Sequence, residues 1–245
     1  MDNKTIQKYI LPFEKRKQLS KELVFKQMFV IWNEERLQTD QKQGSIPYLL
    51  KKAHEECEKK HPEKPIMSRL EWGMFYNQSG QERLKRVEKE KDSYSLNLYH
   101  GRTVLDFVET AKQFSQILKE RGINISSSIC LNFIYIVIVD YSYIEYVRQI
   151  KAIHNFCLKN SNTKYKLTDP LTCLNNGVDA TIFSSDDKLL FAVQVVPESY
   201  LKDTSRNKKI KLLNKQKHDS FEYIYRIKVK TIYASTSGFI KHISD

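Results

Sequence analysis

One short stretch of this 245-residue sequence carries polar side chains where two strands are expected to pair. Residues 178–200 read VDATIFSSDDKLLFAVQVVPESY, and two apolar runs joined by a tight polar turn predict a hairpin. Asp179 stands near the start of the first run, and Gln194 lies inside the second, two residues after Ala192. The stretch is a site that acts on a substrate, a disabled form of such a site, or an ordinary structural hairpin.

The elements expected around this hairpin alternate between helix and strand. Apolar residues at helical spacing predict a helix at 143–158, and short β-branched runs predict strands. The other expected elements are strands near 164–168, 178–184 and 189–196, a basic helix at 200–218 and a last strand at 222–235. The sequence therefore predicts an α/β (α+β) fold, with a mixed central sheet flanked by the two helices and preceded by a helical N-terminal region.

This order of helix, strand, hairpin, basic helix and strand resembles the αβββαβ core of the PD-(D/E)XK nuclease superfamily, to which many restriction endonucleases belong. The resemblance covers residues 143–235. It implies an Asp on the second strand, and on the third a Glu two residues before a Lys, which together hold one or two divalent cations. Asp179 matches the Asp, while Ala192 and Gln194 fill the other two positions. An alternative alignment places Gln194 and Val196 there.

The resemblance also assigns a role to each of these residues. Asp179 would bind Mg²⁺, Gln194 would orient the attacking water or a phosphate oxygen, and Ala192 would mark a missing carboxylate. One carboxylate holds Mg²⁺ poorly, because this ion prefers octahedral oxygen ligation and strong charge compensation. Glu145 on the preceding helix and Glu198 beyond the strand are candidate supplementary carboxylates. We therefore expect an incomplete metal site, inactive or degenerate, or else a plain hairpin with a capping Asp.

The charge balance favours a polyanionic partner. The chain has 41 Lys and Arg against 29 Asp and Glu, a formal net charge of +12. The stretch 202–218 concentrates this excess, and as a helix it would bury Ile210, Leu212 and Leu213 and direct its cations outward. The candidate nucleic-acid-binding residues are Lys202, Arg206, Lys208, Lys209, Lys211, Lys215 and Lys217. The alternative is an ordinary solvated face in a Lys-rich chain.

The N-terminal part is predicted to be helical. Helices are expected at 20–38 with Ser20 as its cap, at 48–60, around Trp72, Phe75 and Tyr76, and at 103–121 before Gly122. The charged stretch 81–93 is expected to be an exposed helix or linker, and LNFIYIVIVD at 131–140 a buried strand. These features divide the chain into a Lys-rich helical region at 1–100, which contacts a partner or DNA, and an α/β domain at 101–245.

Other patterns give weaker signals. Asp140, at the end of the expected strand 131–140, is either a functional carboxylate or a helix N-cap. Two His-x-x-Cys pairs could hold zinc, but both fall on expected helices; the residues concerned are His54, Cys57, His154 and Cys157, with His61 nearby. The scattered cysteines, the absence of a signal-like apolar run at the start and the short length of segment 129–139 lead us to expect a soluble, intracellular protein without membrane contact.

Two functions from different classes follow. The first is a Mg²⁺-dependent endonuclease of restriction type, acting as a dimer on duplex DNA, whose metal site is incomplete. The second is a non-catalytic DNA- or RNA-binding subunit of a larger assembly. No Gly-rich phosphate loop or GxSxG motif supports nucleotide or serine-hydrolase chemistry.

Overall fold

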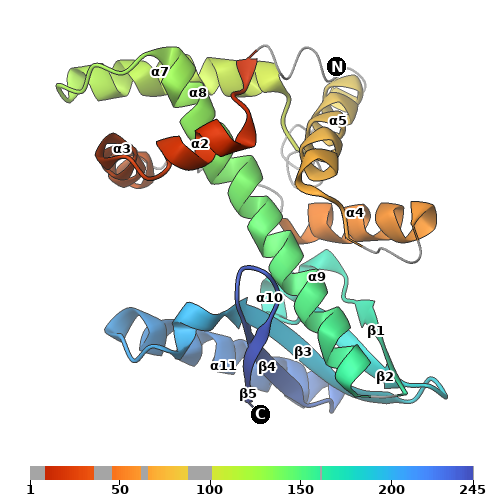
Figure 1. Cartoon of the computed structure of the whole chain (residues 1–245). Coiled ribbons are helices and arrows are strands. Elements are labelled where there is room, and N and C mark those ends of the chain that lie inside the picture. The colour runs from red at the N-terminus through yellow and green to blue at the C-terminus, as the bar shows by residue number, and fades with distance from the viewer. Residues whose placement is uncertain (1–8, 36–45, 62–65, 88–100, 161, 245) are drawn as a thin grey trace. The chain divides into compact units, whose positions relative to one another are not determined.

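A computed structural model describes residues 9–35, 46–61, 66–87, 101–160 and 162–244 (Figure 1). Contacts divide the chain into two compact units. The helical unit comprises Met1–Leu49 and Met67–Tyr143, and the α/β unit comprises Leu50–Ile66 and Ile144–Asp245. This division is discontinuous in sequence, whereas the charged stretch had suggested one boundary near residue 100.

The helical unit is built around aromatic side chains. Its helices are α2 (Phe13–Leu19), α3 (Leu23–Glu34), α5 (Arg69–Val87), α7 (Val104–Glu120) and α8 (Ser127–Tyr135), followed by the π-helical turn η2 (Ile136–Asp140). Trp32 of α3 is fully buried, with ring centroids 5.2 Å from Phe114 and 5.8 Å from Phe133. Edge-to-face pairs of this kind stabilise a core beyond the area they bury.

The predicted N-terminal helices are confirmed, with corrections at their ends. Helices cover the expected segments as α3, α4 (Ile46–Lys60), α5 and α7. The prediction that Ser20 caps α3 is wrong. Ser20 is the C-cap of α2, and Glu22 occupies the N-cap position of α3. Thr103 caps α7 in a reciprocal capping box with Asp106. Of the charged stretch 81–93, residues 81–87 end α5, and residues 88–93 lie outside the described residues.

The predicted strand at 131–140 is wrong, since these residues are helical in α8 and η2. Leu131, Phe133 and Ile134 are all buried, so this helix is apolar on every side. A helix enclosed by its neighbours needs no polar face, and a short apolar run does not distinguish it from a buried strand. The continuous helical run Ser127–Lys159 is long and apolar enough to cross a membrane, but most of its apolar window is buried.

The α/β unit contains one mixed sheet. Its elements after α9 (Tyr141–Lys159) are β1 (Thr163–Leu167), α10 (Pro170–Asn176), β2 (Ala180–Ser184), β3 (Leu189–Pro197), η3 (Glu198–Leu201), α11 (Ser205–Tyr225), β4 (Val229–Ala234) and β5 (Ile240–Ser244). The strand order is β1-β2-β3-β4-β5; β3 and β4 are parallel, and the other neighbours are antiparallel. The expected antiparallel pairing of 178–184 with 189–196 is confirmed, and α11 connects the two parallel strands. The predicted last strand at 222–235 is wrong in its first part, since α11 runs on to Tyr225 and β4 begins only at Val229.

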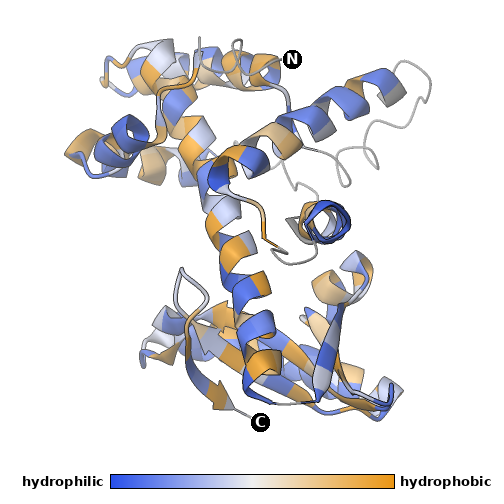
Figure 2. Ribbon diagram, turned by 45° about the vertical axis from the view of Figure 1, so that its right-hand side comes forward, coloured by the Kyte–Doolittle hydropathy of each residue, from blue (hydrophilic) through white to orange (hydrophobic). Residues whose placement is uncertain are grey.

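Helices cover both faces of this sheet (Figure 1). On one face, Ile153 and Phe156 of α9 pack against Ile182 and Val193. On the other face a smaller apolar cluster joins Phe221 of α11 to the sheet. Polar and apolar positions alternate along α9 (Figure 2), as expected for a helix with one face on a sheet. The predicted fold class, a mixed sheet flanked by helices after a helical N-terminal region, is confirmed.

Candidate functional site

Asp179 lies directly before β2, and its carboxylate is already engaged. Its Oδ2 accepts a hydrogen bond from the backbone N–H of Val195 at 2.7 Å, and its Oδ1 accepts one from the Cys173 thiol at 3.2 Å. Its own backbone N–H donates to the Val193 carbonyl at 2.8 Å. The side chain therefore ties β3 and α10 to the start of β2.

Burial governs the electrostatics of this carboxyl group. Loss of solvent raises the pKa of Asp179 to about 6, and the negative charge of Glu145 adds to this rise. The hydrogen bonds from Val195 and Cys173 oppose it by favouring the ionised form. Burial also raises the pKa of the Cys173 thiol, so Cys173 stays a neutral donor. Among the described residues, no cation contributes to the shift of the Asp179 pKa.

Of the two predicted supplementary carboxylates, Glu145 of α9 is the one whose charge acts on the pKa of Asp179. Its side chain is about half exposed, and its Oε2 pairs with Nη1 of the buried Arg148 at 2.5 Å. Arg148 Nε has no hydrogen-bond partner within the described part of the chain. Glu198, the other supplementary candidate, begins η3, where its Oε2 lies 4.0 Å from Lys241 Nζ. Each supplementary carboxylate therefore already faces a cation of the chain.

Ala192 is not placed where a metal ligand could act. It is fully buried in the apolar cluster with Val178, Phe221 and Val229, beneath α11. A longer acidic side chain at this position would enter that cluster and lose its contact with water. The position that the resemblance assigns to the second carboxylate is therefore part of the core.

Gln194 and His218 meet beside Gly177, which ends α10 in the left-handed conformation with φ of 67°. A Cβ on Gly177 would lie 2.9 Å from Gln194 Nε2 and 3.7 Å from His218 Nε2. Gln194 Oε1 and His218 Nε2 are both buried and without a hydrogen-bond partner among the described residues. Burial lowers the pKa of His218, so its imidazole is neutral. Sequence reasoning missed His218, because nothing in the pattern distinguishes it from the solvated residues around it.

These residues do not fit a magnesium ion. Asp179 uses both oxygens in structural hydrogen bonds, and Ala192 supplies neither an oxygen nor room for one. Across the described ranges, no group of three or more His, Cys, Asp and Glu side chains could hold a metal ion. The same finding leaves the two His-x-x-Cys pairs without a zinc centre in that part of the chain. His54 instead contacts the Tyr165 hydroxyl at 3.2 Å and stacks on its ring.

The basic helix is present as α11, and its cations face solvent. Lys202 precedes it, and all seven predicted cationic residues are exposed. Lys208 pairs with Asp203 at 3.3 Å, and Lys217 Nζ donates to the Leu174 carbonyl at 2.9 Å. Within the described part of the chain, no acidic partner is found for Arg206, Lys209, Lys211 and Lys215.

The buried face predicted for this helix is wrong. Leu212 and Leu213 are 58% and 49% exposed, and α11 instead buries Asn207, His218 and Phe221. Ile210 and Asn214 are half-buried on this same face, and Asn207 anchors the first turn to carbonyls of Ser199 and Lys202, both at 2.9 Å. Leu212 and Leu213 lie off this face and are exposed together with the cations.

Asp140 is not a helix N-cap, the second of the two roles predicted for it. It lies in the last turn of η2, inside a continuous helical run, so it cannot follow a strand or cap a helix. It is buried and forms ion pairs with Arg16 and Arg69.

Comparisons of the chain with protein-family models, with curated proteins and with solved structures found no match.

Proposed function

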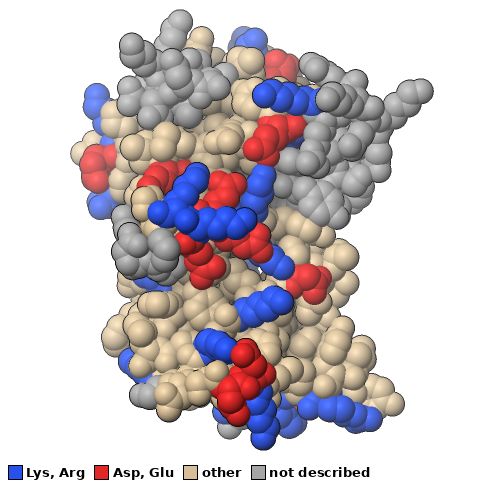
Figure 3. Space-filling model, turned by 90° about the vertical axis from the view of Figure 1, so that its right-hand side faces the viewer, with Lys and Arg blue, Asp and Glu red and all other residues tan. Residues whose placement is uncertain are grey.

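We propose that this protein binds nucleic acid through the exposed cations of α11, with duplex DNA as the favoured partner. The observation that carries this proposal is the set of cations on α11 that have no acidic partner in the described part of the chain, Arg206, Lys209, Lys211 and Lys215. Such side chains lose little on meeting phosphates, because no internal ion pair has to break. On the face shown in Figure 3, cations and carboxylates are interspersed.

The topology of the α/β unit supports the proposed relation to the PD-(D/E)XK superfamily. Leaving aside the short α10 and η3, the order α9, β1, β2, β3, α11, β4 is the αβββαβ order that the resemblance implies. The position of Asp179 directly before β2, with its backbone N–H bonded to the Val193 carbonyl of β3, supports matching it to the family's Asp. A common fold does not carry a common activity, since activity depends on the site residues.

Binding without cleavage is the function that these side chains support best. The Asp179 carboxylate holds the fold together, and the Ala192 position is closed by apolar neighbours. We therefore propose a non-catalytic subunit that binds nucleic acid within a larger assembly or as a homodimer. Cleavage of duplex DNA with Mg²⁺ is the second candidate, favoured by the position of Asp179 and by the proximity of Glu145.

The test is a salt titration of binding, followed by fluorescence anisotropy on a mixed-sequence DNA duplex and an RNA duplex. Changing Arg206, Lys209, Lys211 and Lys215 together to Gln removes four cations from one helix. If all four contact phosphates, the slope of log K against log salt falls by about 3 to 4. The matched control changes four exposed lysines of the helical unit to Gln: Lys26, Lys85, Lys112 and Lys119. Equal losses in the two variants, or no binding at low salt, would contradict the proposal.

A further inference from the structure

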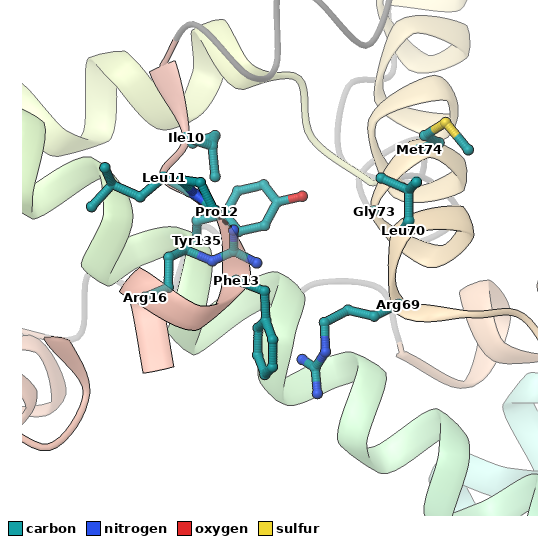
Figure 4. A pocket seen from close by; sticks show the side chains of 10 residues that line it. All are labelled: Ile10, Leu11, Pro12, Phe13, Arg16, Arg69, Leu70, Gly73, Met74 and Tyr135. Carbon is teal, nitrogen blue, oxygen red and sulfur yellow. Dashed lines mark hydrogen bonds between the residues drawn. The ribbon is translucent and has the colours of Figure 1, made fainter. Parts of the chain in front are cut away.

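A cavity of about 580 Å³ lies within the helical unit, apart from the residues proposed to bind nucleic acid. Its lining comes from the segment leading into α2, from the first turns of α5 and from the end of α8 (Figure 4). In Figure 4, Phe13, Arg16 and Tyr135 lie on one side of it, and Leu70 and Met74 lie on the other. Cavities of this size are typical of small-molecule sites.

The charged groups of this cavity form one network. Both oxygens of Asp140 accept from Arg16, through Nε at 2.8 Å and Nη2 at 2.8 Å. Nη1 of Arg16 donates to the Leu11 carbonyl at 2.5 Å, which fixes the guanidinium in place. Arg69 Nη1 reaches the same carboxylate at 3.1 Å. Two guanidinium groups share one carboxylate, so one positive charge remains uncompensated by this network.

Arg69 is the group that carries this remaining charge toward the cavity. Its guanidinium lies 3.9 Å from the centroid of the Phe13 ring and 4.6 Å from that of Tyr143, so aromatic rings hold it in position. Asp140 is its one hydrogen-bond acceptor among the described residues, which leaves donors on Nε and Nη2. Its side chain is 27% exposed, whereas that of Arg16 is 8% exposed. A ligand can therefore reach Arg69 without displacing the Arg16–Asp140 pair.

The remaining walls are mostly apolar, with one neutral polar group. Ile10 and Leu11 face the cavity from one side, and Leu70 and Met74 from the other. Leu70 lines this open, mostly apolar cavity, and its side chain is 63% exposed. Burial raises the pKa of Tyr135 to about 12, so its hydroxyl keeps its proton. The cavity thus offers apolar surface for the body of a ligand and cationic donors at one end.

We propose that this cavity binds a small organic monoanion, a carboxylate attached to an apolar chain or ring, with the carboxylate on Arg69. A carboxylate suits the site because its two oxygens match two parallel N–H donors of a guanidinium. A phosphate monoester would bring close to two negative charges at neutral pH, whereas the network supplies one positive charge. An apolar body gains by covering surface that water otherwise contacts.

Calorimetry on the full chain tests this proposal with decanoate as the probe. Decanol keeps the chain without the charge, decyltrimethylammonium reverses the charge, and acetate removes the chain. We expect saturable binding of decanoate with one molecule per protein, about tenfold tighter than decanol, and no saturable binding of the other two. Equal binding of decanoate and decyltrimethylammonium would show a nonspecific apolar surface and would overturn the proposal, as would no binding of decanoate.

Paired variants locate the site. Arg69→Gln should weaken decanoate binding about tenfold while leaving decanol unchanged. Arg121→Gln removes a guanidinium of the same unit that pairs with Glu34 and should leave both unchanged. Leu70→Ser should weaken both ligands, and Leu105→Ser, at a leucine of similar exposure on α7, should weaken neither. Identical effects within each pair would place the ligand elsewhere. DNA binding should be unaffected by Arg69→Gln, so the two proposals fail separately.

Discussion

Two carboxylates, one in each compact unit, are held in opposite ways. In the helical unit, Asp140 is buried between the guanidinium groups of Arg16 and Arg69. In the α/β unit, Asp179 accepts its hydrogen bonds from a backbone N–H and from the thiol of Cys173, with no cation in contact among the described residues. The first carboxylate is held by cations, whereas burial raises the pKa of the second and so favours its protonated form.

This difference shows that the position of an acidic residue does not reveal its role. Both Asp140 and Asp179 stand next to apolar runs, where functional carboxylates are often found. Asp140 is matched by arginines 124 and 71 residues away in sequence, which no local pattern indicates. Asp179 lies where the resemblance expects a metal ligand, yet no cation in the described part of the chain contacts its carboxylate. The predictions below test this contrast, beginning with the largest expected effect.

The largest effect is expected from adding a second carboxylate to the α/β unit, in the apolar cluster around Ala192. Ala192→Glu restores the acidic residue of the motif, but it also places a charge in the apolar cluster beneath α11. We expect the free energy of unfolding to fall by about 4 kcal/mol. Chemical denaturation measures this change, and Leu190→Glu, at an exposed position of the same strand, should change it by less than about 1 kcal/mol.

A different result would revive the nuclease hypothesis. If Ala192→Glu is as stable as Leu190→Glu, the cluster opens to accept the carboxylate. Incubation of that variant with Mg²⁺ or Mn²⁺ and a long DNA duplex should then give discrete fragments, and these should vanish when Asp179→Ala is added. Without such fragments, the hairpin is a structural element.

The second prediction concerns the carboxylate that has cationic partners. Asp140→Asn leaves the buried Arg16 beside a neutral amide, so we expect the free energy of unfolding to fall by about 3 kcal/mol. The control is Asp203→Asn, which removes an exposed pair with Lys208 and should cost less than about 1 kcal/mol. Equal changes in thermal or urea denaturation would mean that burial of the Asp140 network adds nothing to its strength.

The sequence predicted those parts of the fold whose signals are local. The hairpin, α7 and α9 follow from periodic apolar residues and from end signals such as Gly122. The short helix α10 was missed although Asp169-Pro170 begins it and Gly177 ends it, which is the usual asymmetry of helix ends. The segment 131–140 was assigned to the wrong element because a helix enclosed on all sides has no period to detect.

The candidate sites were less predictable, because they depend on contacts between distant residues. The burial of Ala192 is decided by Phe221, which lies on another element. The solvent exposure of Leu212 follows from its place on α11, off the face that buries Asn207 and Phe221. Arg16 resembles the other cations of its helix in sequence, and its burial appears only when Asp140 is brought beside it. No spacing rule within one element contains this information.

The third prediction uses the raised pKa of Asp179. A pKa that rises on folding, here from 3.8 to about 6, gives stability that is present below about pH 4 and lost as the pH rises through 6. Asp179→Asn removes this dependence, so the free energy of unfolding of the variant should rise relative to that of the wild type by about 3 kcal/mol between about pH 4 and pH 7. Urea denaturation across this range measures the difference. A constant difference at every pH would show that Asp179 is ionised as easily in the folded chain as in the unfolded one.

The smallest expected effect compares two glycines that end helices, one in each unit. Gly122 and Gly177 both have positive φ, 78° and 67°, so Ala at either position is strained by about 1 kcal/mol. A Cβ at Gly122 meets nothing within 4 Å, whereas one at Gly177 would lie 2.9 Å from Gln194 Nε2. Gly177→Ala should therefore be destabilised more than Gly122→Ala, by up to about 1 kcal/mol. Urea denaturation of both variants at one pH measures this difference.

Because the two share the same backbone strain, their difference isolates the crowding around Gln194 and His218. If the two variants lose the same free energy of unfolding, the Gln194 side chain moves aside freely and the close approach at Gly177 costs no stability.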